Sequence, residues 1–106
     1  MNIYHVWADP REGVDKTVFI SNMKKFMDLL VEKNMMVSYR ITQMKLGFRS
    51  MDLPEYHIIM DFENMQQLDD AMEVVINNTA VDEAHVGFNQ MVDPETIQHA
   101  LYRDIV

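Results

Sequence analysis

Three histidines of this chain lie in short apolar segments whose composition is typical of β-strands. They are His5, His57 and His85. Histidine changes its charge more readily near neutral pH than any other side chain, and neutral imidazole is the commonest protein ligand of metal ions. These residues could therefore transfer protons or bind a metal or a haem. Their use depends on whether the elements that carry them bring the rings together.

The hydrophobic pattern predicts the order strand, helix, strand, strand, helix, strand. Strands are expected at residues 2–8, 37–46, 56–62 and 84–92, with residues 47–54 linking the second to the third. One helix is expected from the N-cap residue Asp15 to about Lys33, and another from Asn64 to Asn77. Asp93-Pro94-Glu95 resembles a helix start and predicts a short C-terminal helix. A chain of 106 residues is expected to form one domain, 1–106.

Two strand-helix-strand units predict an α+β, ferredoxin-like βαββαβ fold, in which an antiparallel sheet carries both helices on one face. Side chains alternate between the two faces of a strand, so residue parity separates the faces. The helix-covered face is expected to be the apolar one. It collects Tyr4, Val6, Ala8, Val37, Tyr39, Ile41, Tyr56, Ile58, Met60, Phe62, Val86 and Phe88.

The opposite face mixes large apolar side chains with polar and charged ones. It is expected to collect Ile3, His5, Trp7, Arg40, Thr42, Met44, His57, Ile59, Asp61, Gly87, Asn89 and Met91. This composition suits neither a fully solvated surface nor a core, and it resembles half of a protein interface. We therefore expect a homodimer that forms through this face.

The predicted topology gives each histidine a place. We expect the first and third strands to be parallel neighbours, so that His5 and His57 lie side by side on the bare face. His85 is expected at the far end of the first strand, near Trp7 or Asp9. Such a spread does not favour a three-histidine zinc site, and we predict histidines hydrogen-bonded in a polar lining, with no metal or cofactor.

The hairpin of the second and third strands predicts a charge pair. If Leu46 lies opposite Glu55, Arg40 lies opposite Asp61. A guanidinium and a carboxylate in such a pair bind each other in two places. We favour a structural ion pair, and the alternative is that Arg40 binds an anionic ligand.

Composition limits the classes of partner. The chain contains nine Lys and Arg residues and 17 Asp and Glu residues, for a formal net charge of -8. This negative charge disfavours binding to nucleic acid and to anionic lipid surfaces. The chain has no cysteine, which excludes disulfides and thiolate sites. No apolar run predicts a membrane span, and the N-terminus lacks a signal-peptide pattern. We expect a cytoplasmic protein.

Five short segments resemble a family of small bacterial proteins of unassigned function. They are Asn2-Ile3-Tyr4-His5, Lys45-Leu46-Gly47-Phe48, Glu55-Tyr56-His57, His85 with Asn89, and Ala100-Leu101-Tyr102-Arg103-Asp104. The whole chain resembles the dimeric alpha-beta barrel superfamily. That resemblance implies that two ferredoxin-like subunits press their bare sheet faces together into a closed barrel.

Three functional hypotheses remain open at this stage, because the superfamily contains many activities. The first is a small-molecule-binding or structural module without a reaction. The second is a cofactor-independent monooxygenase or isomerase acting on a small planar organic molecule, with His57 or His5 as proton acceptor. The third is a haem-binding protein with a histidine as axial ligand. The candidate pocket residues are Trp7, Tyr56, Arg40, Asp61, Asn89 and His85, with Asn89 or Arg40 holding an oxyanion in the second hypothesis.

Overall fold

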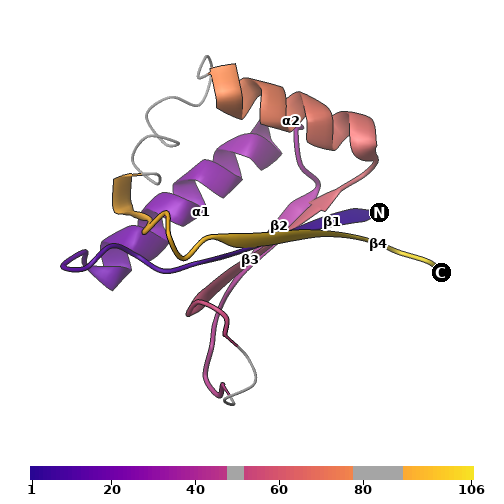
Figure 1. Cartoon of the computed structure of the whole chain (residues 1–106). Coiled ribbons are helices and arrows are strands. Elements are labelled where there is room, and N and C mark those ends of the chain that lie inside the picture. Colours follow the sequence, from indigo (N-terminus) through magenta and orange to yellow (C-terminus); the bar gives the residue numbers. More distant parts are fainter. Residues whose placement is uncertain (48–51, 78–89) are drawn as a thin grey trace.

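The described part of the chain forms a four-stranded antiparallel sheet, and its two long helices pack on one face of the sheet (Figure 1). A computed structural model describes residues 1–47, 52–77 and 90–106. The elements are β1 (Asn2–Ala8), α1 (Lys16–Glu32), β2 (Ser38–Gln43), β3 (Tyr56–Phe62), α2 (Met65–Asn77) and β4 (Gln98–Arg103). This is the predicted ferredoxin-like order of elements. None of the helices in these ranges is long and apolar enough to cross a membrane.

The strands are arranged in the order β2-β3-β1-β4, and β1 pairs with β3 in antiparallel fashion. The expectation that β1 and β3 are parallel is therefore wrong. Helix α1 returns the chain so that β2 runs in the same direction as β1, and the β2–β3 hairpin then reverses it. β3 therefore runs opposite to both β1 and β2, and it pairs with each of them in antiparallel fashion.

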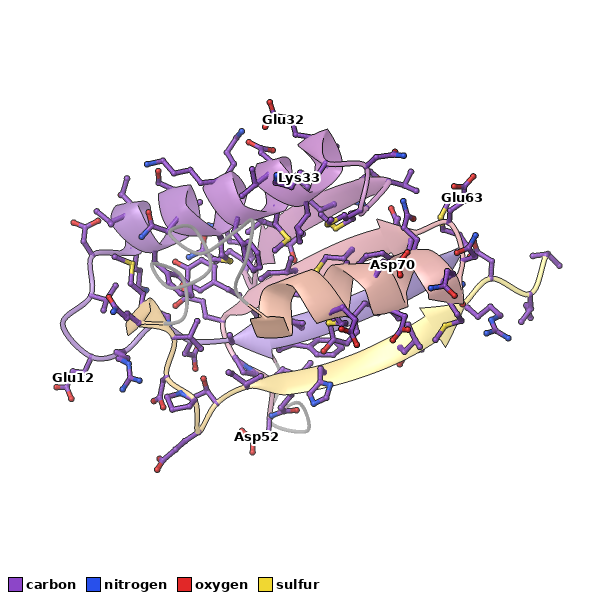
Figure 2. The ribbon with its side chains drawn as sticks, turned by 90° about the horizontal axis from the view of Figure 1, so that it is seen from above. Glu12, Glu32, Lys33, Asp52, Glu63 and Asp70 are labelled. Carbon is purple, nitrogen blue, oxygen red and sulfur yellow. The ribbon has the colours of Figure 1, made fainter. Side chains whose placement is uncertain are left out.

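The core lies between the sheet and the helices, on the predicted face. Burial alternates strictly along β3, where Tyr56, Ile58, Met60 and Phe62 are buried. Helix α1 supplies the facing side chains Phe19, Met23, Phe26, Met27 and Leu30. Figure 2, seen from above, shows both helices lying across the sheet, with Glu32 at the upper edge of the view and Asp70 on α2.

Both ends of α1 are capped, by a side chain at the N-terminus and by backbone hydrogen bonds at the C-terminus. The Asp15 carboxylate accepts hydrogen bonds from the backbone N–H groups of Thr17 and Val18, as its N-cap position predicts. Asn34 adopts a left-handed conformation with φ of 61° just after the helix. The N–H of Met35 then reaches the carbonyl of Leu30, which completes a Schellman-type end.

A capping box begins α2, as the spacing of Asn64 and Gln67 predicts. The Asn64 side chain accepts from the Gln67 N–H at 2.9 Å. The Gln67 side chain reaches back and accepts from the Glu63 N–H. Its amide also donates to the carbonyl of Asn34, which ties the start of α2 to the end of α1.

The register of the β2–β3 hairpin differs by two residues from the prediction. Arg40 lies opposite Ile59, and Asp61 lies opposite Ser38, whose hydroxyl donates to the Asp61 carboxylate at 2.8 Å. The predicted Arg40–Asp61 pair is therefore wrong. A shift of two residues keeps every side chain on its predicted face, so hydrophobic parity cannot distinguish the two registers.

The C-terminal part of the chain departs most from the prediction. The sequence predicts the fourth strand at residues 84–92, but the fourth strand of the sheet is Gln98–Arg103, which pairs with β1, and the expected terminal helix is absent there. Residues 94–96 form a single turn, held by the Thr96 N–H donating to the carbonyl of Asp93. The turn does not extend into a helix because residues 98–103 pair with β1 instead. Residues 84–89, including His85, Gly87 and Asn89, lie outside the described ranges.

Two further side chains differ from the predicted faces. Met91 packs against the edge of the core rather than lying on the bare face, and its sulfur is 3.3 Å from the Asn22 side-chain nitrogen. Val37 precedes β2 and is exposed instead of buried. Both residues lie outside the paired strands, so strand alternation does not apply to them.

Candidate functional site

The candidate site lies on the face of the sheet turned away from both described helices, which we call the open face (Figure 1). We define it by the residues that share this parity in the paired strands. They are Ile3, His5 and Trp7 on β1, Arg40 and Thr42 on β2, His57, Ile59 and Asp61 on β3, and Gln98, Ala100 and Tyr102 on β4.

His5 and His57 are hydrogen-bonded to each other at the centre of this face. His5 Nδ1 and His57 Nε2 lie 2.9 Å apart. Because His5 pairs with Ile59 and His57 with Trp7, the two histidines are diagonal neighbours across β1 and β3. The structure thus brings them together as predicted, although the strands are antiparallel.

The two imidazole rings meet edge to edge. Their centroids are 5.1 Å apart and their planes are 23° apart. The centroid separation exceeds the 2.9 Å nitrogen separation by about the sum of the two ring radii. The hydrogen bond therefore runs nearly along the line between the ring centres, which favours a strong, well-aligned contact.

Aromatic rings on both sides fix the orientation of this pair. Trp7 stacks on His57 with centroids 4.4 Å apart and planes 10° apart. Tyr102 meets His5 edge-on, with centroids 4.8 Å apart and an interplanar angle of 73°. We call His5, His57, Trp7 and Tyr102 the aromatic cluster. Such stacked and edge-on contacts contribute attraction beyond burial alone.

A cavity of about 170 Å³ adjoins the cluster at the end where β2 and β3 begin to separate. Trp7 and His57 border it together with Thr42, Met44 and Leu53. Glu55 also lines it, and its carboxylate binds Lys16 Nζ at 2.9 Å. A small molecule in this cavity would contact both the indole and the His57 imidazole.

The other predicted pocket residues lie apart from the cluster. Arg40 is exposed on β2, opposite Ile59, and Asp61 is held by Ser38. Tyr56 is buried on the helix-covered side, where it packs edge-on against Phe19, so it does not border the open face. His85 and Asn89 fall outside the described ranges.

Sequence reasoning missed the contribution of β4 to this site. The sequence predicts a short helix after Asp93 and no strand there, yet Tyr102 lies on β4 beside His5. The signal was present in the alternation of residues 98–103, in which Gln98, Ala100 and Tyr102 share one face. On the other side of β4, the hydroxyl of Tyr4 lies 3.3 Å from His99 Nδ1, so the fourth histidine is separate from the aromatic cluster.

Comparison with protein families places the chain in one of them. The model of DUF6614, a family of unknown function, matches residues 1–106. The chain belongs to this family. This agrees with the resemblance to small proteins of unassigned function. No curated protein matches the sequence.

Solved structures share the fold at low sequence identity. A protein from Arabidopsis thaliana has a TM-score of 0.77 at 15% identity, covering 100% of this chain and 97% of its own. A dimeric ferredoxin-like protein of unknown function from Jannaschia sp. CCS1 has a TM-score of 0.72 at 13% identity, covering 98% of this chain and 100% of its own. A dimeric protein of unknown function with a ferredoxin-like fold from Bacteroides fragilis has a TM-score of 0.59 at 9% identity, covering 97% and 95%.

The aromatic cluster supplies two imidazoles and no third metal-binding side chain. Over the described ranges, no group of three or more histidine, cysteine, aspartate or glutamate side chains is placed to hold a metal ion. The chemistry that this cluster can offer with its own residues is therefore hydrogen bonding, proton transfer and stacking on a flat ligand.

Partial burial lowers the pKa of His57 from its ordinary value of 6.5, and the neighbouring His5 lowers it further. A charged His57 would be an imidazolium that is partly shielded from water and lies beside a second histidine. Both effects disfavour the charged form. The neutral ring is therefore the favoured form near neutral pH. The Nε2 atom of His57 is hydrogen-bonded to His5, and this bond fixes the orientation of the His57 ring.

The depressed pKa predicts a pH dependence of stability. An unfolded His57 binds a proton at its ordinary pKa of 6.5, whereas the folded one binds it only at lower pH. The contribution of His57 to stability is thus complete above that value and is lost as pH falls through the folded pKa. We expect the wild-type melting temperature to fall more than that of His57→Gln between about pH 7.5 and 5.5.

Thermal denaturation followed by circular dichroism measures this difference. Thr42→Ser, which changes the same face without altering any titratable group, serves as the control and should follow the wild type. Equal pH dependence in wild type and His57→Gln would contradict the assignment.

Proposed function

We propose that the protein is a homodimer whose subunits join through their open faces and bind a small planar organic molecule beside the aromatic cluster. The observation that carries this proposal is the cluster itself. Two hydrogen-bonded imidazoles, an indole and a phenol ring lie on a sheet face that neither described helix covers.

Composition and relatives support the dimer. The open face carries Ile3, Ile59 and Trp7, all partly exposed in the single chain, and Tyr102 is 58% exposed. Contiguous apolar surface of this kind commonly marks an interface. The structural neighbours from Jannaschia and Bacteroides are themselves described as dimeric. We propose the same assembly here, in the cytoplasm and without nucleic acid.

The surroundings of the cavity support a small planar ligand. Ligand sites are mostly apolar hollows with a few polar groups that fix orientation. Here Trp7, Met44 and Leu53 give apolar contacts, while His57 and Thr42 give polar ones. The flat, parallel rings of Trp7 and His57 favour a ligand that is itself flat.

Light scattering combined with the fluorescence of Trp7 tests the assembly. Trp7 is the single tryptophan of the chain, so its emission reports on the open face alone. We expect twice the chain mass at micromolar concentration, and a red shift of the emission when dilution separates the subunits. A monomer at micromolar concentration would overturn the proposal.

Binding is tested by screening small aromatic fragments against the ¹⁵N-labelled protein by NMR. Fragments that bind are expected to shift the resonances of Trp7, His57 and Thr42 more than those of the helix-covered face, such as Tyr39. Shifts spread evenly over both faces, or no binding fragment, would contradict a site beside the cluster.

A further inference from the structure

The number of protons in the histidine pair gives it a property that neither ring has alone. Each neutral imidazole carries one N–H proton and one lone pair. One of these protons lies between His5 Nδ1 and His57 Nε2. The ring that donates it has a lone pair on its outer nitrogen, and the ring that accepts it has its own proton on the outer nitrogen. The neutral pair therefore presents one acceptor and one donor at its two outer ends.

Moving the shared proton exchanges these two roles. When a proton arrives at the outer lone pair, the shared proton can pass to the other ring, whose outer proton can then leave. The edge-to-edge geometry suits this transfer because the hydrogen bond lies nearly along the line between the ring centres. Within the described part of the single chain, no hydrogen bond is formed by His57 Nδ1 or His5 Nε2, so each can bind a ligand or a water molecule.

The surroundings set the direction of transfer. His57 borders the cavity with Trp7, so a ligand there meets the His57 end. The other titratable or charged groups of the open face are Arg40 on β2, Asp61 on β3 and Tyr102 on β4. Asp61 is hydrogen-bonded to Ser38, and Glu55 at the cavity is paired with Lys16. These partners reduce the electrostatic effect of the two carboxylates on the histidine pair and on an anionic ligand.

We propose that His57 and His5 form a proton relay, in which His57 takes the proton of a weakly acidic O–H group on a planar ligand and His5 releases it. This inference rests on the proposed ligand site. The ligand O–H bond breaks and a bond to His57 Nδ1 forms. The shared proton passes from His57 Nε2 to His5 Nδ1, and the proton on His5 Nε2 leaves to water. The ligand becomes an anion, one proton enters the solvent, and the pair remains neutral.

The probe for this relay is p-nitrophenol, a planar phenol whose anion is yellow. At a pH near the ordinary histidine value of about 6.5, we expect the dimer to bind it as the anion. The ratio of anion to neutral phenol should be at least about tenfold higher in the bound probe than in bulk solution, which corresponds to one pKa unit. Equilibrium dialysis measures binding, and the visible spectrum of the bound probe measures ionisation.

Two variants separate the relay from simple packing. His57→Gln removes the imidazole that accepts the ligand proton. His5→Phe keeps a ring beside Trp7 but removes the nitrogen that releases the proton to water. Both should bind the probe as the neutral phenol. Tyr39→Phe, on the helix-covered face where Tyr39 bonds Asp28, leaves the cluster intact and should still ionise the probe. Circular dichroism and light scattering establish that each variant is a folded dimer before the spectra are compared.

The pH profile gives a second readout. A singly protonated pair has three protons, one shared and one on each outer nitrogen, so it has no acceptor. Enrichment of the anion should therefore disappear as pH falls and should show no loss on the alkaline side up to about pH 9, because neutral imidazole does not lose its second proton there.

The outcomes distinguish the relay from the proposed function. A wild-type dimer that binds the probe only as the neutral phenol, or does not bind it, overturns the relay while the dimer stands. Ionisation that persists in both His57→Gln and His5→Phe also overturns it. A monomeric wild type overturns the proposed function first.

Discussion

Ile59→Lys is expected to convert the proposed dimer into monomers. Ile59 is partly buried near the centre of the open face, between His5 on β1 and Arg40 on β2. A lysine there would place one unpaired ammonium from each subunit at the interface, close to the existing charge of Arg40. Leaving such a charge buried without a partner costs several kcal/mol. We expect the dimer dissociation constant to rise by at least about 100-fold, or about 2.7 kcal/mol.

Sedimentation velocity over a range of concentrations measures this change. Ile20→Lys is the matched control, because Ile20 lies on α1 and is already 38% exposed. It should remain dimeric. If both variants dissociate equally, or neither does, the open face is not the interface.

Phe19→Ala is expected to produce the largest loss of stability among single substitutions of the core. Phe19 is fully buried on α1 and packs edge-on against Tyr56, with ring centroids 5.3 Å apart. Removing its ring deletes buried apolar surface and leaves a cavity between helix and sheet. Such substitutions typically cost about 3–5 kcal/mol.

Urea denaturation gives the free energy of unfolding for this variant. Val18→Ala is the control one residue earlier, at a position that is 44% exposed, and should change stability by less than about 0.5 kcal/mol. A loss below about 1 kcal/mol for Phe19→Ala would mean that the core around Tyr56 is not packed as described.

The cluster and the core depend on each other through β3. Tyr56 and His57 are consecutive residues, so their side chains point to opposite faces of the sheet. Burial of Tyr56, Ile58 and Met60 under the helices fixes the strand, and the same alternation holds His57 and Ile59 on the open face. Strong burial on one side thus orients a histidine on the other.

The positions of β1, β3 and both helices were predictable because each carries a signal within a few residues. Alternation along residues 2–8 and 56–62, the N-cap Asp15, and the capping box at Asn64 are all local patterns, and all are confirmed. Parity also placed His5, Trp7 and His57 on one face. That placement survived a wrong strand direction, because reversing a strand does not change which residues share a face.

The pairing between strands was not predictable from such local patterns. Parity allows any register shift of two residues, so Arg40 was assigned to Asp61 when Ile59 lies opposite it. The turn after Asp93 carries a strong helix-start signal, yet pairing with β1 makes residues 98–103 a strand. Tertiary contacts of that kind override a local propensity of a fraction of a kcal/mol per residue.

The sequence by itself determined the class of fold, the core face and the residue types available on the open face, because these follow from alternation, capping and composition. Only the tertiary structure decided that His5 Nδ1 meets His57 Nε2, that Trp7 stacks on His57, and that Tyr102 lies beside His5. His5 and His57 are 52 positions apart in the chain, and His5 and Tyr102 are 97 positions apart. Their geometry is set by strand order and register, which depend on the packing of the whole sheet.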